Sequence, residues 1–202
     1  MAISTYAELQ AACSSFAGGS SDSNFADAIR TAIALCEVDL GRQLRVPELV
    51  VRRLGPIDDV CEHLPSDFSK LISLTLIEDE LETPLGQIPD DALAFYEAKL
   101  TTGSPRCFVL LGTSLKLVPA PESDGSQVLR LAYYRTLPTL SDDEPTNDVL
   151  TAHPDCYLWG SLSVLGEYIE DAGRLPRFEQ RFQNAIKSAN KMSVLRDGTL
   201  AL

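Results

Sequence analysis

The stretch Thr139–Gly160, TLSDDEPTNDVLTAHPDCYLWG, marks the point where a β-rich middle returns to a helical end of the chain. A strand is predicted just before it, at Leu129–Tyr134, and helical periodicity follows it. The stretch begins as an acidic loop. It then reaches Pro154, which suits the first position of a helix because it has no amide hydrogen to leave unpaired. Asp155 in the first turn carries a negative charge, which the positive end of the helix dipole stabilises. The pattern therefore predicts β-strands before this junction and α-helices after it.

Helical periodicity marks both ends of the chain. Thr5 and Glu8 have the spacing of a capping box, and Gly18-Gly19 stops the apolar run that follows. A second apolar stripe at period 3.6 lies on one face, and the other face holds charged residues, among them Glu37. After the junction, two more helices are expected to end at Gly173 and Gly198. The four predicted helices cover about residues 5–17, 25–40, 154–173 and 176–197.

Alternating hydrophobicity between these helices predicts strands. The clearest signal is a hairpin whose turn contains Gly112, a residue that accepts a positive φ at no steric cost. A short helix is predicted at Asp90–Leu100, and Glu78–Glu80 are expected to form a solvated loop. The predicted strands are Leu49–Leu54, Leu71–Ile77, Cys107–Leu111, Ser114–Val118 and Gln127–Tyr134.

The order of elements predicts an α+β fold. The N- and C-terminal helices would pack as one helical bundle, with an antiparallel β-sheet or sandwich inserted between them. The bundle would be discontinuous, from residues 1–45 and 150–197, with the inserted β-rich domain at 46–149 and a C-terminal tail at 198–202. A chain of 202 residues buries about 70% of its unfolded surface, which is enough for a core in each part.

The charge of the chain limits its partners. The formal net charge is −12, from 29 acidic and 17 basic residues. A protein that grips phosphates needs clustered Lys and Arg, so this balance disfavours one. An acidic wall would instead repel a DNA duplex and let it pass without sequence-specific binding. Plain solubility is the simpler explanation of the same charge, and composition alone favours it.

The chain has the composition of a protein that stays in the cytosol where it is made. No apolar run approaches the roughly 18 to 20 residues of a membrane span. Met1–Leu9 lacks a basic segment followed by an apolar one, so no signal peptide is expected. Five cysteines without a C-x-x-C pair argue against a disulfide framework and a zinc ribbon. They are expected to be small buried hydrophobic residues.

His153 and Cys156 form the one pair that suggests catalysis. They lie three residues apart at a predicted helix start, and a helix N-terminus lowers the pKa of a thiol. A Cys–His nucleophile is therefore conceivable, and a small Cys-dependent hydrolase stays as an alternative function. Against it, no oxyanion-hole motif is visible. The competing interpretation places His153 at the helix cap with Cys156 packed inward, and no catalytic residue is assigned.

Metal-binding patterns are weak. Cys61 and His63 lie two residues apart without a second ligand pair. Acidic clusters at 58–59, 78–80 and 142–144 do not match the spacing of a calcium-binding loop, so solvated loops are expected. We therefore predict no metal site and no cofactor.

Two segments are candidate interaction sites. A small basic cluster consists of Arg42, Arg45, Arg52 and Arg53. A solvated strand face is its default interpretation; an acidic partner, and after it phosphates, are the binding alternatives. The residues after the last helix form an apolar tail, and they are Gly198, Thr199, Leu200, Ala201 and Leu202. A frayed terminus is the alternative interpretation of this tail.

The junction resembles the bacteriophage head-to-tail connector, or adaptor, proteins of the podovirus-like tail tubular type. The matching residues are Leu140-Ser141-Asp142-Asp143, Pro145-Thr146-Asn147, Leu150-Thr151, His153-Pro154-Asp155, Tyr157-Leu158 and Gly160-Ser161-Leu162. Five further pieces resemble the family in the same order: Thr5–Leu9, Leu64–Phe68, Gly103–Arg106, Leu117–Pro121 and Leu131–Tyr134. Trp159 departs from the pattern, which often has another aromatic or a small residue there.

The resemblance implies a structural virion protein and not an enzyme. Copies would form a twelve-subunit ring below the portal protein, extend the DNA channel and provide a platform for the tail nozzle or tail tube, with tail fibres as a further partner. Such a ring needs head-to-tail interfaces that close on themselves. The protein would be made in the host cytoplasm and located at the head–tail junction of the virion. The tail at 198–202 would reach toward the portal. Another head- or tail-completion protein is the alternative.

Overall fold

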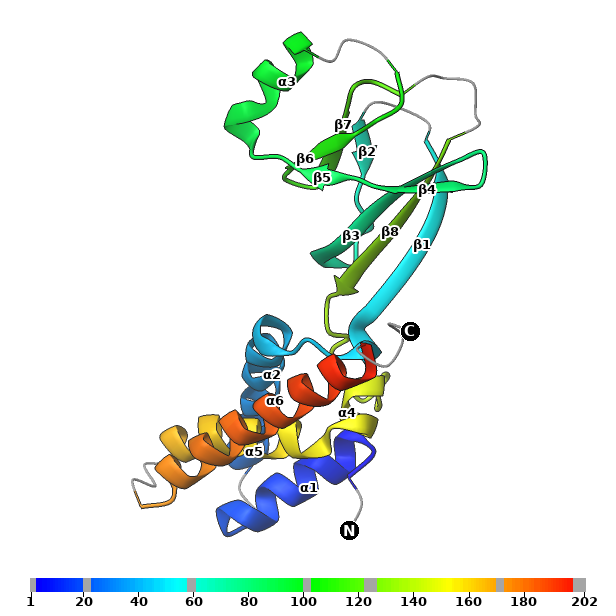
Figure 1. Cartoon of the computed structure of the whole chain (residues 1–202). Helices are drawn as coiled ribbons and strands as arrows, with labels where there is room; N and C mark the ends of the chain where they lie inside the picture. The colour runs from blue at the N-terminus through cyan, green and yellow to red at the C-terminus, as the bar shows by residue number, and fades with distance from the viewer. Residues whose placement is uncertain are drawn as a thin grey trace. The chain divides into compact units, whose positions relative to one another are not determined.

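The computed structural model describes residues 3–19, 23–57, 61–99, 103–121, 127–169 and 173–197. The chain divides into two units. One holds the described residues up to Leu49 and those from Leu137 on, and the other holds those between Val50 and Thr136. The first unit is helical and the second contains the strands, which confirms the predicted α+β class (Figure 1).

The helical unit draws its helices from both ends of the chain. They are α1 (Tyr6–Ala17), α2 (Ser23–Gln43), the 3-10 turn η1 (Pro47–Leu49), α4 (Asp148–Ala152), α5 (Pro154–Tyr168) and α6 (Leu175–Asp197). The capping box predicted for α1 is present, since the amide of Glu8 donates to Thr5 Oγ1 and the amide of Thr5 donates to Glu8 Oε2. Gly18 ends the helix with φ 100°, as its position predicted.

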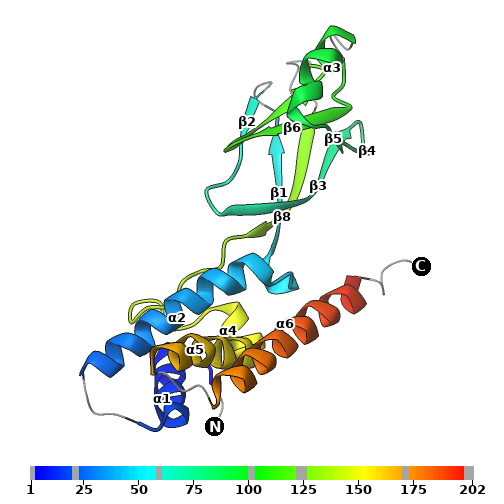
Figure 2. The ribbon, with the colours of Figure 1, turned by 90° about the vertical axis from the view of Figure 1, so that its left-hand side faces the viewer.

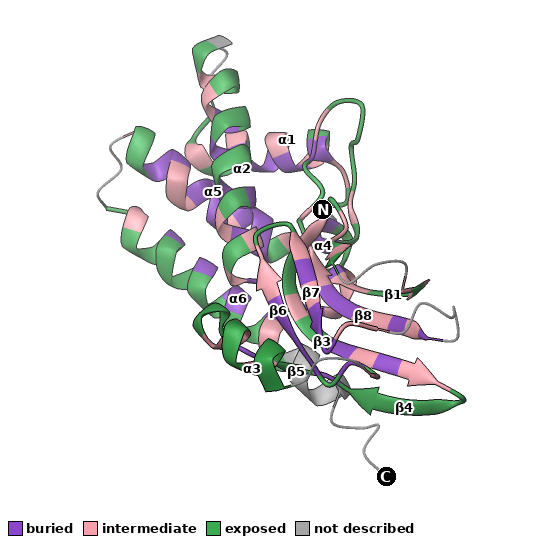
Figure 3. Cartoon of the chain, turned by 90° about the horizontal axis from the view of Figure 1, so that it is seen from above, coloured by how far each residue is buried: buried purple, intermediate pink, exposed green. Residues whose placement is uncertain are grey.

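Helix α5 is the centre of the helical unit. It packs against α1, α2, α4 and α6, and it lies between α2 and α6 in the view of Figure 2. Buried residues run along its length (Figure 3). Gly160 is the point of closest approach, because a Cβ atom there would collide with Cys36 Sγ from α2 and lie 2.7 Å from Phe182 Cε2 of α6. Helix α6 buries an apolar stripe, which consists of Phe178, Phe182, Ala185, Ile186 and Ala189.

The β unit consists of two four-stranded sheets. Their orders are β1-β8-β3-β4 and β2-β7-β6-β5, and every pair is antiparallel except the two-residue pair of β5 with β6. The elements are β1 (Val50–Pro56), β2 (Cys61–His63), β3 (Phe68–Glu78), β4 (Leu81–Pro84), β5 (Gly86–Gln87), η2 (Asp90–Ala92), α3 (Leu93–Lys99), β6 (Cys107–Leu111), β7 (Ser114–Val118) and β8 (Val128–Arg135).

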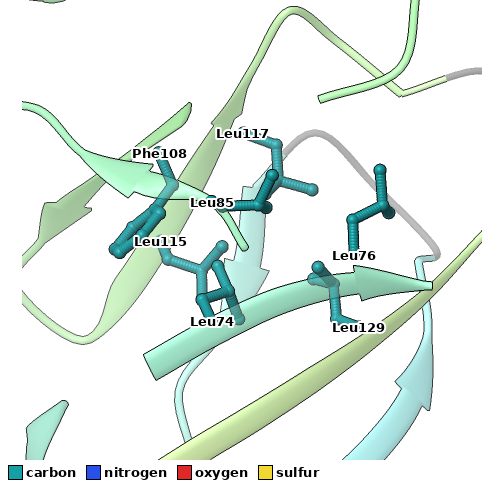
Figure 4. Close-up of a cluster of buried hydrophobic side chains, with 7 residues drawn as sticks. All are labelled: Leu74, Leu76, Leu85, Phe108, Leu115, Leu117 and Leu129. Carbon is teal, nitrogen blue, oxygen red and sulfur yellow. The ribbon is translucent and has the colours of Figure 1, made fainter. Parts of the chain in front are cut away.

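A leucine-rich core joins the two sheets. Side chains of β3 and β8 meet those of β6 and β7 in one cluster, drawn in Figure 4: Leu74, Leu76, Leu85, Phe108, Leu115, Leu117 and Leu129. A second, smaller cluster contains Cys107, Val109 and Val118, with Leu93 and Tyr96 of the α3 region packed against it. Alternate residues of β6 thus enter different clusters, as the period of two in a strand requires.

Several boundaries differ from the sequence prediction. The solvated loop predicted at Glu78–Glu80 is an exposed tight turn at Asp79 and Glu80, both with positive φ, whereas Glu78 is the last residue of β3. Strands β2, β4 and β5 were not predicted; β4 is exposed throughout, so it has no alternating pattern. Helix α5 ends at Tyr168 and not at Gly173. Residues 137–149, which the prediction assigned to the β insertion, lie in the helical unit.

Gly160→Ala tests the close approach of α2 and α6 to α5. We expect it to lower the free energy of unfolding by about 1–3 kcal/mol, because overpacking outweighs the roughly 1 kcal/mol that alanine gains in a helix. Gly166→Ala is the matched control on the same helix, since its Cβ would lie 3.2 Å from the flexible Leu175 Cδ1. Urea unfolding followed by Trp159 fluorescence measures both. Equal stability of the two variants would contradict this packing argument.

Candidate functional site

A buried carboxylate ties the junction to the helical unit. Helix α2 places Glu37 in the interior, with 6% of the residue exposed. Its Oε1 accepts a hydrogen bond from the amide of Leu140 at 2.8 Å and a longer one from the hydroxyl of Tyr157 at 3.4 Å. Burial raises the pKa of Glu37 to about 6, against the lowering effect of these two donors. The sequence analysis placed Glu37 on the solvated face of its helix, which is wrong.

Asn147 extends this network and starts the next helix. Its Oδ1 accepts from the amide of Leu150 at 2.7 Å, the arrangement of an N-cap, and thereby begins α4. Its Nδ2 donates to the carbonyl of Pro138 at 2.7 Å and to Tyr157 Oη at 2.8 Å. Tyr157 is fully buried, and this burial raises the pKa of its hydroxyl. Asn147, Tyr157 and Glu37 thus form one chain of hydrogen bonds.

The acidic part of the junction is a hydrogen-bonded turn with exposed carboxylates. The amide of Ser141 donates to the carbonyl of Glu144 at 3.0 Å, and the amide of Glu144 donates back to Ser141 Oγ at 3.0 Å. Asp142 and Asp143 are exposed within this turn. The carbonyl of Pro145 then accepts from the amide of Tyr6 at 2.6 Å, which joins the turn to the first residue of α1. Thr146, between Pro145 and the capping Asn147, is exposed.

His153 and Pro154 connect α4 to α5. The amide of His153 donates to the carbonyl of Val149 at 2.8 Å, and Pro154 occupies the start of α5. His153 Nε2 lies 3.5 Å from Glu48 Oε2, which joins the junction to η1. Asp155 is exposed in the first turn of α5. The predicted junction residues therefore lie along one continuous segment of the helical unit.

The thiol of Cys156 does not have the properties of a nucleophile. Burial raises its pKa to about 12, so it stays protonated at neutral pH, and the expected lowering by the helix N-terminus is wrong. The imidazole of His153 is directed to Glu48. Cys13, Cys36 and Cys107 are buried too, in agreement with the sequence analysis, whereas Cys61 is exposed on β2.

The predicted basic cluster is divided between the two units. Arg42 pairs with Asp39 at 3.4 Å, and the guanidinium of Arg45 donates to backbone carbonyls near the end of α2. In the β unit, Arg53 pairs with Asp67 at 3.3 Å, and Arg52 is exposed on β1.

Other predicted features fall on loops or outside the described ranges. The apolar tail at 198–202 and the acidic pair at 58–59 lie outside the described residues. Within the described ranges, no group of three or more His, Cys, Asp or Glu residues is placed to hold a metal ion. In that same part of the chain, no helix is long and apolar enough to span a bilayer.

Sequence reasoning missed a cluster of aromatic and arginine side chains where α1, α5 and α6 meet. We call it the aromatic–arginine surface, and it consists of Phe16, Trp159, Arg174, Arg177, Phe178 and Arg181. The guanidinium carbon of Arg181 lies 4.4 Å from the centre of the Trp159 ring, and Trp159 stacks at 6.2 Å on Phe178. The outward arginines of the last helix were a partial signal, but their meeting with Phe16 depends on tertiary packing.

The buried polar side chains of the junction hydrogen-bond its backbone, and its exposed carboxylates can contact other molecules. Such an arrangement suits a protein that acts through its surface. The sequence model of the SU10 adaptor protein family matches residues 4–201, and the chain belongs to this family of phage adaptor proteins. It is therefore a structural protein of a bacteriophage and a component of the virion, as the resemblance implied. No individual curated protein matches the chain.

Glu37→Gln tests the buried carboxylate through its pH dependence. The pKa of Glu37 is about 6 in the fold, against an ordinary 4.5. Between these two pH values the folded protein therefore keeps a proton that the unfolded chain has already released. The contribution of this proton to the free energy of unfolding is fully present below the pKa of the unfolded chain. It is lost as the pH rises through the pKa of the folded protein. The free energy of unfolding of wild type relative to Glu37→Gln should fall by about 2 kcal/mol between pH 4 and 7.

Urea unfolding at several pH values, followed by Trp159 fluorescence, measures this difference. Glu179→Gln, on the exposed side of α6, is the control for losing one acidic charge and should change stability by less than about 0.5 kcal/mol. A stability difference between wild type and Glu37→Gln that does not change with pH would contradict the raised pKa.

Substitutions of Asn147 separate its two functions. Asn147→Ala removes the cap of α4 and the donor to Pro138 and Tyr157, so we expect a loss of about 2 kcal/mol in the free energy of unfolding. Asn147→Ser keeps an oxygen for the Leu150 amide and should recover about 1 kcal/mol. Thermal and urea unfolding measure both variants. If serine were no better than alanine, the cap would not contribute.

Proposed function

We propose that this adaptor protein forms a ring at the head–tail junction of the virion, below the portal protein. Twelve copies extend the DNA channel and provide the platform on which the tail nozzle or tail tube, and tail fibres, assemble. The observation that carries the proposal is the match to a phage adaptor family over residues 4–201. The apolar tail at 198–202 contacts the portal in this proposal.

Charge supports passage of DNA without tight binding. The net charge of −12 makes the surface repel phosphates on average. A channel lined in this way does not hold the duplex through counterion release, which needs clustered Lys and Arg.

Co-assembly with the portal protein of the same phage tests the proposal. The two purified proteins are mixed, and the product is examined by mass measurement and electron microscopy, with each protein alone as the control. We expect a twelve-subunit ring stacked on one end of the portal. A chain that stays unbound at several salt concentrations and instead binds a tail protein would favour a completion protein of the head or tail.

Removing residues 198–202 tests the predicted contact of the tail with the portal. The truncated protein should unfold at the same temperature as the full chain but need a higher concentration to bind the portal. Replacing Leu200 and Leu202 with serine is the matched variant, since it keeps the length and removes the apolar side chains. Unchanged binding of both variants would exclude the tail as a portal contact.

A further inference from the structure

The aromatic–arginine surface has the composition of a binding site for an acidic partner. Phe16 is 47% exposed, and its ring meets the edge of Trp159 at a centroid distance of 5.6 Å. Arg174 Nη1 donates to the carbonyl of Phe16 at 2.9 Å, which fixes the end of α1 against the start of α6. The six residues line a pocket of about 220 Å³.

Trp and Arg are the residues most enriched among those that dominate the energy of protein interfaces. Here both are held in place before binding. Arg181 lies over the Trp159 ring, and Phe178 stacks with the same ring, so less side-chain entropy is lost when a partner binds. Arg174, Arg177 and Arg181 bring three positive charges together on a chain whose net charge is −12. Such a surface attracts carboxylates.

The acidic turn Asp142–Glu144 is the complementary surface. It carries three successive exposed acidic side chains, and its backbone is closed by the reciprocal hydrogen bonds of Ser141 and Glu144. These carboxylates are opposite in charge to the guanidinium groups of Arg177 and Arg181. The hydrogen bonds that close the turn and the ring contacts that hold Trp159 and Arg181 reduce the ordering that such a contact costs.

In one copy, the acidic turn lies at the start of α1, and the aromatic–arginine surface includes the end of α1. The acidic turn is tied to the first residue of α1, through the 2.6 Å hydrogen bond between the Tyr6 amide and the Pro145 carbonyl. Phe16 lies ten residues further along the same helix, a distance of about 15 Å at 1.5 Å per residue. A contact between the two surfaces therefore joins two copies of the chain.

We propose that the aromatic–arginine surface of one copy binds the turn Asp142–Glu144 of the next copy, an inference that rests on the proposed ring. Different patches of the two copies meet in this contact, so it is heterologous, and repeating it around an axis closes a ring. Arg177 and Arg181 are the specificity-determining residues on one side, and Asp142 and Asp143 on the other.

Charge reversal tests this contact. The surface variant carries Arg177→Glu and Arg181→Glu, and the turn variant carries Asp142→Lys and Asp143→Lys. Each variant alone should need at least about tenfold higher concentration than wild type to form rings on the portal, because like charges then face each other. In an equimolar mixture every contact between unlike copies has opposite charges. The mixture should therefore form alternating rings at nearly the wild-type concentration.

The controls separate this inference from the proposed function. Lys187→Glu with Lys191→Glu makes the same charge change on the exposed side of α6 and should leave assembly unchanged. Circular dichroism melting shows whether each variant folds. If wild type itself forms no ring, the proposed function fails. If wild type forms rings and both variants alone do so equally well, only the inference fails. Loss of assembly that mixing does not restore assigns the arginines to the portal or to DNA and overturns the contact between copies.

Discussion

The helical unit depends on the absence of a side chain at Gly160. Helices from opposite ends of the chain reach α5 there, with Cys36 of α2 on one side and Phe182 of α6 on the other. The β unit separates these two parts in the sequence, so their association has to overcome the entropy of closing a long loop. Close packing around α5 supplies the compensating free energy, because buried apolar surface and dispersion contacts are greatest where helices approach most closely.

The buried network of Glu37, Tyr157 and Asn147 gives this packing its register. Apolar contacts between α2 and α5 are not directional, whereas a hydrogen bond is, and a buried carboxylate without its donors is expensive. Glu37 has its donors only when the amide of Leu140 and the hydroxyl of Tyr157 are both in place. The burial of a titratable group thus destabilises the fold somewhat near neutral pH and specifies one arrangement of the segment that returns from the β unit.

Elements that depend on residues close together in the sequence were predicted well. Contacts between residues far apart in the sequence were not visible in it. The capping box of Thr5 and Glu8 and the hairpin around Gly112 each depend on residues within a few positions, and the structure has both. Glu37 appeared solvated because its partner Leu140 lies 103 residues away. Strand β4 was missed because pairing with β3, and not burial, makes it a strand. The sequence identified the junction as a segment, but it did not reveal which residues elsewhere in the chain form hydrogen bonds with it.

The pairing of β1 with β8 gives the chain a modular character. Val50 and Tyr134 are direct partners in this antiparallel pair, so the backbone enters and leaves the β unit at neighbouring positions, about 5 Å apart. An insertion with adjacent ends imposes little on its host, because a short turn can replace it without moving the flanking residues. The β unit can therefore be shortened or replaced without moving the helices that surround α5.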